Sequence, residues 1–148
     1  MKLAMNPQQQ AELALLALVI WREARGEVLF TKQAVAWSIR NRVLNPGWWG
    51  HSWWSVILMP MQYSSFNRAD PNAVKWPMQV DPSWEDALAV AADVYTADLT
   101  QAPKILDLTN GAVSYFDQGM DLNPPSWAVD GHMQHVCDYG RLHFYAKA

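Results

Sequence analysis

The sequence predicts a mainly α fold of the α+β class, with a small β element toward the C-terminus. Up to about residue 95, apolar residues recur at helical spacings of three and four. From Thr100 onward, the chain instead alternates turns with short apolar runs. The chain has 148 residues, of which 51% are hydrophobic and 17% charged. A chain of this size forms one compact domain that buries roughly two-thirds of its unfolded surface, so we expect residues 1–148 to be a single domain.

The first predicted helix runs from about Asn6 to Arg25. Four apolar residues share one face of it, as in a helix that packs on one side: Leu13, Leu16, Ile20 and Ala24. Asn6 is a suitable N-cap and Pro7 a suitable first helical residue. Gly26 offers a residue at which the helix can stop.

A second helix is predicted from Lys32 to Leu44, with Thr31 as its N-cap. Its expected buried face consists of Val35, Ala36, Ile39 and Val43. The helix ends at Asn45-Pro46-Gly47. Its small alanine residues let another helix approach closely, and we expect the first helix there. This packing places the turn that carries Glu23 and Glu27 between the two helices.

Two further helices follow. Ser52 can cap a short helix that begins at Trp53 and that Pro60 ends. Asp81 starts a longer helix, with a predicted buried stripe of Ala87, Leu88, Ala91, Val94 and Tyr95. Residues 61–79, between them, are rich in Pro, Asn, Asp and Ser. A loop of this length inside a small domain usually has a function.

Three short apolar runs after residue 100 fit strands as well as helical turns: Lys104-Ile105-Leu106, Ala112-Val113-Ser114-Tyr115-Phe116 and His143-Phe144-Tyr145. Before the second run, Thr109-Asn110-Gly111 has the composition of a turn that needs Gly at positive φ. These runs are the source of the predicted β element.

Two glutamates at the end of the first helix are the main candidates for chemistry. On a helical wheel, Glu23 falls beside Leu16 and Ile20, at the rim of the apolar stripe. In one interpretation, Glu23 and Glu27 are a solvated pair of like charges. In the other, apolar neighbours desolvate Glu23 and raise its pKa, so that it holds a proton near neutral pH and acts as a general acid. The pattern alone leaves both interpretations open.

A series of short motifs covers most of the chain: Glu23-Ala24-Arg25-Gly26-Glu27, Gln33-Ala34-Val35-Ala36, Ile39-Arg40-Asn41-Arg42-Val43, Val56-Ile57, Pro60-Met61-Gln62-Tyr63-Ser64, Asp107-Leu108-Thr109-Asn110-Gly111-Ala112 with Tyr115, and Gly140 with His143-Phe144-Tyr145. In order and spacing, the series resembles the cell wall hydrolase family that includes the spore cortex-lytic enzymes. Each motif is weak alone, and their shared order makes the resemblance specific.

The resemblance implies a lysozyme-like fold with helices around a substrate cleft. It also implies cleavage of peptidoglycan glycan strands between N-acetylmuramic acid and N-acetylglucosamine by lytic transglycosylation. Glu23 would protonate the glycosidic oxygen and then take the proton of the muramic C6 hydroxyl, which closes an internal ether. Because one carboxyl serves both steps, the scheme requires no second carboxylate and no cofactor.

The resemblance also implies substrate-binding residues, Glu27, Gln62, Tyr63, Ser64, Thr109 and Tyr115, and we add Trp127 to the expected lining of the cleft. Gln62 and Ser64 would bond sugar hydroxyls or the N-acetyl group, and Tyr63 would stack on a pyranose ring, where the family usually has Phe. The alternative for this stretch is an ordinary Pro-led turn with a core Tyr. The turn at Thr109 would hold Tyr115 toward the cleft.

Three residues near Glu23 have expected supporting roles. Glu27 would position the loop or a substrate group. Asn41 would either cap a loop or brace the Glu23 turn, and we favour the loop, because a helical Asn is unfavourable unless its amide finds a partner. Arg25 is a test of the scheme, since a guanidinium paired with Glu23 would lower the pKa of the acid.

Three alternative functions remain. One is a hydrolytic muramidase of the phage endolysin type. A second is a zinc-dependent wall hydrolase that uses His132, His135 and His143, with Cys137 nearby, because these residue types bind zinc. Their spacing matches no common zinc motif, so a strand or turn with surface histidines and a buried Cys is the simpler interpretation, and we expect no metal. The third is a non-catalytic glycan-binding module whose platforms are drawn from the 9 Trp residues.

Composition limits the partners. The formal net charge of -3 argues against nucleic acid, which needs a basic face. The apolar run Leu13–Trp21 is too short to span a bilayer and lacks the flanks of a signal peptide. We expect a monomer made in the cytoplasm, without a membrane segment or signal peptide, that binds peptidoglycan glycan strands after release, as in phage or prophage lysis.

Overall fold

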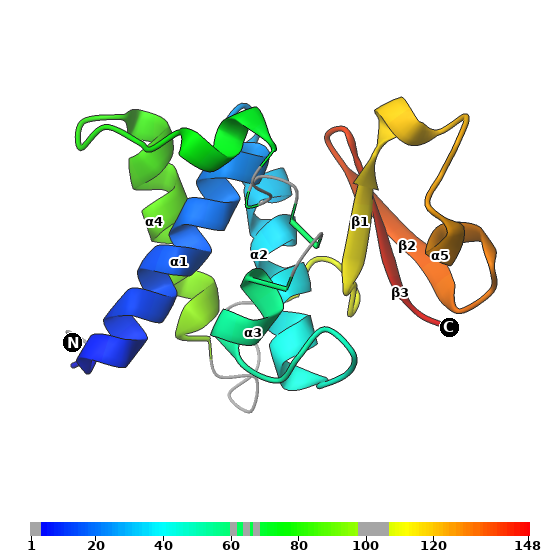
Figure 1. Ribbon diagram of the computed structural model, residues 1–148, viewed down its shortest axis with the longest axis horizontal. Helices are drawn as coiled ribbons and strands as arrows, with labels where there is room; N and C mark the ends of the chain where they lie inside the picture. Colours follow the sequence, from blue (N-terminus) through cyan, green and yellow to red (C-terminus); the bar gives the residue numbers. More distant parts are fainter. Residues whose placement is uncertain (1–3, 60–61, 64–65, 67–68, 98–106) are drawn as a thin grey trace.

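The computed structural model describes residues 4–59, 62–63, 66, 69–97 and 107–148. A helical part and a small antiparallel sheet lie side by side (Figure 1). The elements in chain order are α1 (Pro7–Ala24), α2 (Leu29–Leu44), α3 (Trp53–Ile57), the 3-10 helix η2 (Pro71–Val74), α4 (Pro82–Tyr95), β1 (Ser114–Asp117), the 3-10 helix η3 (Gln118–Met120), α5 (Ser126–Val129), β2 (Met133–Tyr139) and β3 (Leu142–Lys147). The predicted α+β class with mainly helical content is confirmed.

Local capping sets the start of three helices, as the sequence predicts. Asn6 forms a capping box with Gln9 at the start of α1. The Ser52 hydroxyl accepts a hydrogen bond from the Ser55 amide at the start of α3, and the Asp81 carboxylate accepts one from the Ser83 amide at the start of α4. Each bond satisfies an amide that the first helical turn leaves unpaired.

Helix α2 begins earlier than predicted. Its N-cap is Val28, not Thr31, and the amide of Thr31 already donates to the Val28 carbonyl within the first turn. Thr31 is fully buried. Its hydroxyl packs against the β2–β3 turn, where a Cβ added to Gly140 would lie 2.8 Å from Thr31 Oγ1. The prediction was wrong because Thr31 uses its side chain for this tertiary contact.

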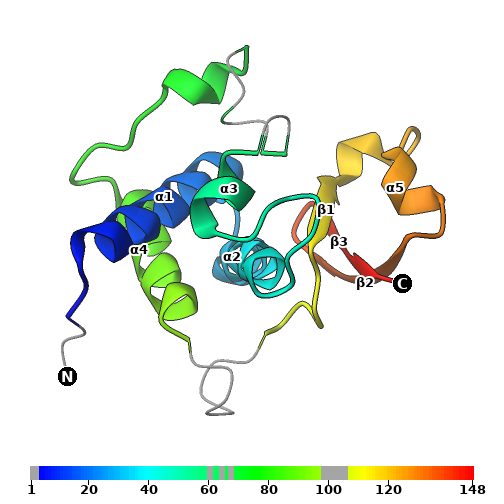
Figure 2. The same ribbon diagram turned by 60° about the horizontal axis from the view of Figure 1, so that its bottom comes forward.

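The core lies among α1, α2, α3 and α4, and α2 lies between α1 and the sheet in both views (Figures 1 and 2). Leu16, Val19 and Ile20 of α1 and Val35 and Ile39 of α2 are fully buried. On α4 the buried residues are Ala87, Val90, Ala91 and Val94. The predicted members Leu88 and Tyr95 only border this core, since Tyr95 directs its hydroxyl to the Glu12 carboxylate. No helix in the described ranges is long and apolar enough to span a membrane.

The sheet has the order β1-β3-β2 and is antiparallel throughout. Alternate residues of the central strand β3 (Leu142, Phe144 and Ala146) are buried, and the first two join the hydrophobic core. His143 and Tyr145 therefore point to the opposite face. Two of the three predicted C-terminal runs form β1 and β3, and residues 104–106 lie outside the described part of the chain. Strand β2 contains His135 and Cys137.

Candidate active site

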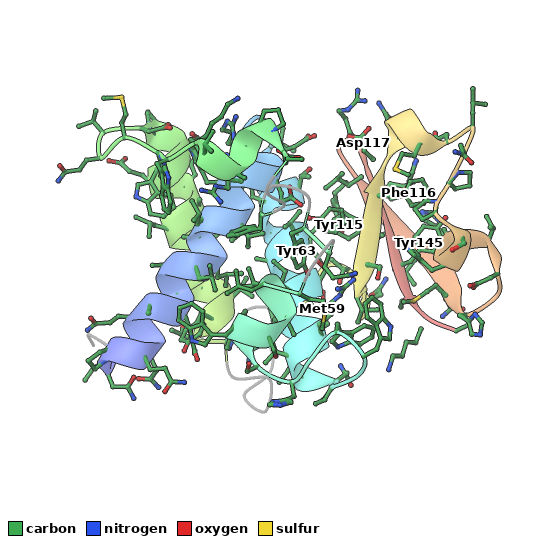
Figure 3. The ribbon with its side chains drawn as sticks, viewed as in Figure 1. Met59, Tyr63, Tyr115, Phe116, Asp117 and Tyr145 are labelled. Carbon is green, nitrogen blue, oxygen red and sulfur yellow. The ribbon has the colours of Figure 1, made fainter. Side chains whose placement is uncertain are left out.

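A cavity of about 690 Å³ lies where the helical part meets the sheet. The described residues that line it come from α1, α2, the loops after α2 and α3, β1, η3, α5 with its flanking residues, and the first residue of β2 and of β3: Glu23, Arg42, Trp48, Gln62, Ser114, Tyr115, Phe116, Asp117, Met120, Pro125, Trp127, Asp130, His132, Met133 and Leu142. Figure 3 shows Tyr63 and Tyr115 at this junction. Among these residues are four of those predicted for the site: Glu23, Gln62, Tyr115 and Trp127.

Glu23 lies in the last turn of α1 and is half-buried. Its flanking residues Arg22 and Ala24 are buried, so the end of the helix is embedded in the protein. The hydroxyl of Tyr115 donates a hydrogen bond to Glu23 Oε1 at 3.2 Å. A carboxyl group therefore reaches the cavity from a rigid helix, beside an aromatic ring.

Two tyrosines adjoin Glu23. The ring of Tyr63 is buried, and its centroid lies 6.5 Å from that of Tyr115. Burial raises the pKa of Tyr115 well above its ordinary value, and the nearby charges of Glu23 and Tyr63 add to this effect. Burial also raises the pKa of Tyr63, although the charge of Arg42 opposes the shift. Both phenols stay protonated at neutral pH, so Tyr115 remains a hydrogen-bond donor.

Arg42 of α2 connects this helix to the loop that carries Gln62 and to strand β1. Its guanidinium donates to Gln62 Oε1 at 3.1 Å and to Ser114 Oγ at 3.0 Å, and it also donates to the Val113 carbonyl. The side chain is only 5% exposed. The loop that carries Gln62 and the strand that carries Tyr115 are thereby fixed to α2.

The role of Arg42 was not predicted, although a signal for it was present. Arg42 lies seven residues after Val35 and three after Ile39, so it falls on the predicted apolar face of α2. A charged residue on such a face needs partners within the protein, because a buried charge without them is strongly unfavourable.

Arg25 has partners in the loop before α4 and on its own helix. Its Nη2 donates to Asn72 Oδ1 at 3.0 Å. The guanidinium carbon lies 4.5 Å from the centroid of the Trp21 ring, which is a favourable cation–π distance. These contacts hold the guanidinium toward Asn72 and Trp21.

The remaining predicted residues divide by position. Tyr63 lies behind the cavity surface, against Tyr115. Glu27 and Thr109 are not among the described residues that line the cavity. Glu27 packs against the β2–β3 turn, where a Cβ on Gly140 would lie 2.5 Å from Glu27 Oε2. Ser64 lies outside the described residues.

Thr109 belongs to a structural turn. It is fully buried, and its amide and hydroxyl both donate to Asp107 Oδ1. Asn41 donates to Asp107 Oδ2 at 2.8 Å and to the Ala112 carbonyl at 2.9 Å. Asn41 thus braces the turn that leads into β1, and β1 in turn presents Tyr115 to the cavity.

Trp127 forms part of the far wall. Its ring makes edge contacts with Phe116 and Tyr145, at centroid distances of 6.0 and 5.4 Å. Trp48, in the loop after α2, is 63% exposed and also lines the cavity. Aromatic rings that line a cavity suit a sugar polymer, because pyranose rings present apolar faces.

Two aspartates that the sequence did not single out also line the cavity. Arg141 donates to both carboxylate oxygens of Asp117, which lowers the pKa of Asp117, as does a hydrogen bond from the Gly119 amide. Hydrogen bonds from the backbone and then the side chain of His132 lower the pKa of Asp130. Both groups are therefore ionised at neutral pH. No sequence signal could have found them, because sheet packing and the η3–α5 segment bring them to the cavity that Glu23 also lines.

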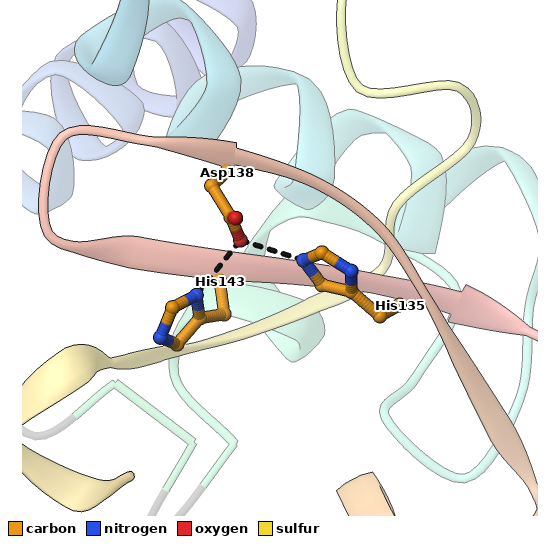
Figure 4. A group of neighbouring side chains, drawn as sticks. All are labelled: His135, Asp138 and His143. Carbon is orange, nitrogen blue, oxygen red and sulfur yellow. Dashed lines mark hydrogen bonds and ion pairs between the residues drawn. The ribbon is translucent and has the colours of Figure 1, made fainter.

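The predicted zinc ligands do not converge as a set. His132 pairs with Asp130 at 3.0 Å, and Cys137 directs its thiol toward the Thr109 carbonyl. His135 and His143 do come together, with Asp138 between them (Figure 4). This group lies on the outer face of the sheet, and its members are not among the described residues that line the cavity.

Comparisons with known proteins agree with the motifs. The profile of the family described as Cell Wall Hydrolase matches residues 26–145, a stretch that begins after Glu23. The catalytic domain of the SleB protein of Bacillus cereus has the same fold, with a TM-score of 0.66 over 91% of this chain and 89% of that chain, at 23% identity. The catalytic domain of the germination-specific lytic transglycosylase SleB from Bacillus anthracis gives 0.67 over 95% and 98%, at 22% identity.

None of the curated proteins matches this chain significantly in sequence. At these identities the two solved structures establish the shared α+β fold. The family profile, which covers most of the chain, goes further and confirms the family that the motifs predict. The chain belongs to the cell wall hydrolase family and is an enzyme that acts on peptidoglycan.

Proposed function

We propose that this enzyme is a lytic transglycosylase that cleaves glycan strands between N-acetylmuramic acid and N-acetylglucosamine, with Glu23 as both general acid and general base. The observation that carries the proposal is the position of Glu23, which is fixed at a helix end and lines the cavity beside the ring of Tyr115. Partial burial next to apolar rings favours the protonated form of a carboxyl group.

The reaction has two proton transfers at one carboxyl group. In the first, protonated Glu23 gives its proton to the glycosidic oxygen, the bond from C1 of the muramic residue breaks, and the glucosamine part leaves with a 4-hydroxyl group. In the second, the Glu23 carboxylate takes the proton of the muramic C6 hydroxyl while that oxygen bonds to C1. The product is a 1,6-anhydro ring, no water is consumed, and Glu23 regains its proton.

The neighbours of Glu23 suit this cycle. Tyr115 donates to Glu23 Oε1, which stabilises the carboxylate between the two transfers. Arg42 holds Gln62 in place through the side-chain oxygen, so that the amide hydrogens of Gln62, which donate to no group in the described part of the chain, can bind a sugar hydroxyl or the N-acetyl carbonyl. We propose that Trp48 and Trp127 contact sugar rings on either side of the cleaved bond, and that Ser64 adds a further hydrogen bond.

Hydrolysis is the second candidate, favoured by one observation. Ionised Asp117 and Asp130 line the same cavity as Glu23, and a hydrolytic muramidase uses a second carboxylate to activate water or to form a covalent intermediate. Transglycosylation stays the first choice because both aspartates already accept hydrogen bonds, Asp117 from Arg141 and Asp130 from His132.

Digestion of purified cell walls tests the proposal. Glu23→Gln keeps the size of the side chain but cannot donate or accept the proton, so we expect soluble fragments to be released at least about 100-fold more slowly. Glu85→Gln makes the same change on an exposed glutamate of α4 and should leave the rate unchanged. Near wild-type activity of Glu23→Gln would contradict the assignment.

The products separate the two reactions. Mass spectra of fragments with 1,6-anhydro-muramic ends support transglycosylation, whereas reducing ends that carry oxygen from H₂¹⁸O support hydrolysis. If the label enters the wild-type product, Asp117→Asn and Asp130→Asn identify which aspartate takes part.

A further inference from the structure

The outer face of the sheet carries a cluster of imidazole and carboxylate groups that the proposed reaction does not use. One ring nitrogen each of His135 and His143 and one carboxylate oxygen of Asp138 lie within 4.8 Å of one another. Asp138 Oδ1 is 2.6 Å from His135 Nε2 and 2.7 Å from His143 Nδ1 (Figure 4). Two imidazoles and a carboxylate that converge in this way form a donor set that suits a divalent transition metal.

The backbone of the sheet directs these three groups to one point. His135 and Asp138 are three residues apart, so in a regular strand they would point to opposite faces. The register of β2 shifts between His135 and Cys137, and this bulge inserts one extra residue. Asp138 therefore lies on the same face as His135. Asp138 also pairs directly with His143 of β3, which brings the third group beside it.

Asp121 gives His143 the orientation that metal ligands usually have. His143 Nε2 lies 2.8 Å from Asp121 Oδ1. A metal-binding His commonly donates its second ring N–H to a carboxylate, which fixes the tautomer and leaves the other nitrogen for the metal. Donation to Asp121 leaves His143 Nδ1, the nitrogen that faces Asp138, with its lone pair.

We propose that His135, Asp138 and His143 bind a Zn²⁺ ion, with water as the fourth ligand and Asp121 holding the ring of His143. Tetrahedral zinc with bonds of about 2.0–2.1 Å keeps its ligand atoms about 3.3 Å apart. The two contacts to Asp138 Oδ1, now 2.6 and 2.7 Å, need to lengthen by less than about 1 Å to reach that separation. The two imidazole nitrogens, which lie within 4.8 Å of each other, also need to settle about 3.3 Å apart. Imidazole ligands favour zinc over Ca²⁺ and Mg²⁺, which prefer oxygen.

Solvent can reach the site. The side chains of His135 and Asp138 are 47% and 51% exposed, and that of His143 is 24% exposed. Four of the residues around the ligands, among them Phe116 and Tyr145, form an open hollow of about 420 Å³ with Asp121, His135, Asp138 and His143. An ion can therefore enter without opening the core.

The expected role of the ion is to hold one wall of the active-site cavity. Asp121 directly follows η3, and Met120, Pro125 and Trp127 of the same segment line that cavity. Zinc bound to His143 would strengthen the link from this ring to Asp121. The η3–α5 segment would then be fixed to β2 and β3, at the place where Trp127 faces the substrate.

Calorimetric titration of the full chain with zinc chloride tests the site. We expect one ion per chain, and Co²⁺ in place of zinc should give the visible absorption of tetrahedral cobalt. His135→Gln and Asp138→Asn should each weaken zinc binding by about 100-fold or more, and Asp121→Asn by roughly 10–100-fold. His132→Gln removes a neighbouring exposed imidazole and should leave the affinity unchanged.

Several results would overturn the proposal. These are wild type without stoichiometric zinc, affinity that persists in His135→Gln and Asp138→Asn, loss of affinity in His132→Gln, or equal binding of Ca²⁺. Circular dichroism of each variant separates lost binding from unfolding, and the four substituted side chains are exposed enough to change without disturbing the core. Glu23→Gln should bind zinc as wild type does, so failure of this site is distinguishable from failure of the proposed reaction.

Discussion

At the scale of single residues, the hydrogen bond from Tyr115 is central to the role proposed for Glu23. Tyr115→Phe keeps the ring but removes the donor at 3.2 Å from Glu23 Oε1. Loss of a hydrogen bond to a charged group costs about 1.5–3 kcal/mol, so we expect kcat/KM on cell walls to fall by roughly tenfold or more. The carboxylate also loses stabilisation, which raises the pKa of Glu23 relative to wild type.

A pH profile distinguishes this role from a structural one. The basic limb of kcat/KM, where the acid loses its proton, should move to higher pH in Tyr115→Phe. Tyr139→Phe is the matched control, because its hydroxyl donates to the Leu108 carbonyl and not to Glu23. A profile of unchanged shape in Tyr115→Phe would show that this phenol does not act on the acid.

At the scale of elements, the β2–β3 turn is fitted to the start of α2. Gly140 has a φ of 56°, and an added Cβ would meet Glu27 Oε2 at 2.5 Å and Thr31 Oγ1 at 2.8 Å. Gly140→Ala therefore combines a left-handed backbone with a clash against two side chains. We expect it to lower the free energy of unfolding by about 2 kcal/mol or more, as the midpoint of urea denaturation would measure.

Gly131→Ala separates the effect of the left-handed backbone from the effect of the side-chain clash. Gly131 has a φ of 91°, but a Cβ there would meet nothing within 4 Å. Its substitution should cost only the backbone strain, so Gly140→Ala should be the more damaging change. Equal losses in the two variants would mean that Glu27 and Thr31 move aside freely and do not hold the turn.

Buried polar links between elements complete the framework. Arg42 of α2 bonds Gln62 and Ser114, and Asn41 bonds Asp107 and Ala112. Adjacent residues of one helix thus fix both the loop that carries Gln62 and the chain that enters β1. The helical part and the sheet form a single cavity because these bonds cross between them.

At the scale of the whole molecule, several carboxylates make the free energy of unfolding depend on pH in the acidic range. Hydrogen bonds lower the pKa of three aspartates. For Asp81 the largest contribution is the hydrogen bond from the side chain of Ser83. The pKa values of Asp117 and Asp130 are lowered by the hydrogen bonds described above. A lowered pKa in the folded state stabilises the protein above the unfolded pKa of about 3.9. That stabilisation is lost as the pH falls through the lower, folded value.

We therefore expect the urea midpoint to be nearly level down to about pH 5 and to decline below about pH 4. Asp81→Asn and Asp117→Asn should each make that decline shallower, since each removes one of the titrating groups. A midpoint that stays constant to about pH 2.5 would contradict the assignment of these carboxylates.

The sequence anticipated much of this molecule through particular residues. Asn6, Ser52 and Asp81 begin helices where predicted, and the motif around Glu23 indicated the family. The sequence-based prediction was wrong for Thr31, which contacts the β2–β3 turn and does not cap α2. It was also wrong for Leu88 and Tyr95, because α4 packs other residues into the core. It also missed Asp117 and Asp130, because neither has a local pattern that distinguishes it from a solvated aspartate.

Which features the sequence predicted and which it did not follows from how far apart along the chain the interacting residues lie. The sequence by itself determined helices α1 to α4 and the C-terminal runs that form β1 and β3, because caps and apolar stripes act over three or four residues. The same patterns placed Glu23 at the rim of an apolar stripe, and the family resemblance made it the candidate acid. Only the tertiary structure decided which groups meet. Tyr115 reaches Glu23 across 92 positions, Arg42 reaches Ser114 across 72, and one bulge turns Asp138 toward His135. Such meetings depend on strand register and on packing between elements, which no short stretch of sequence contains.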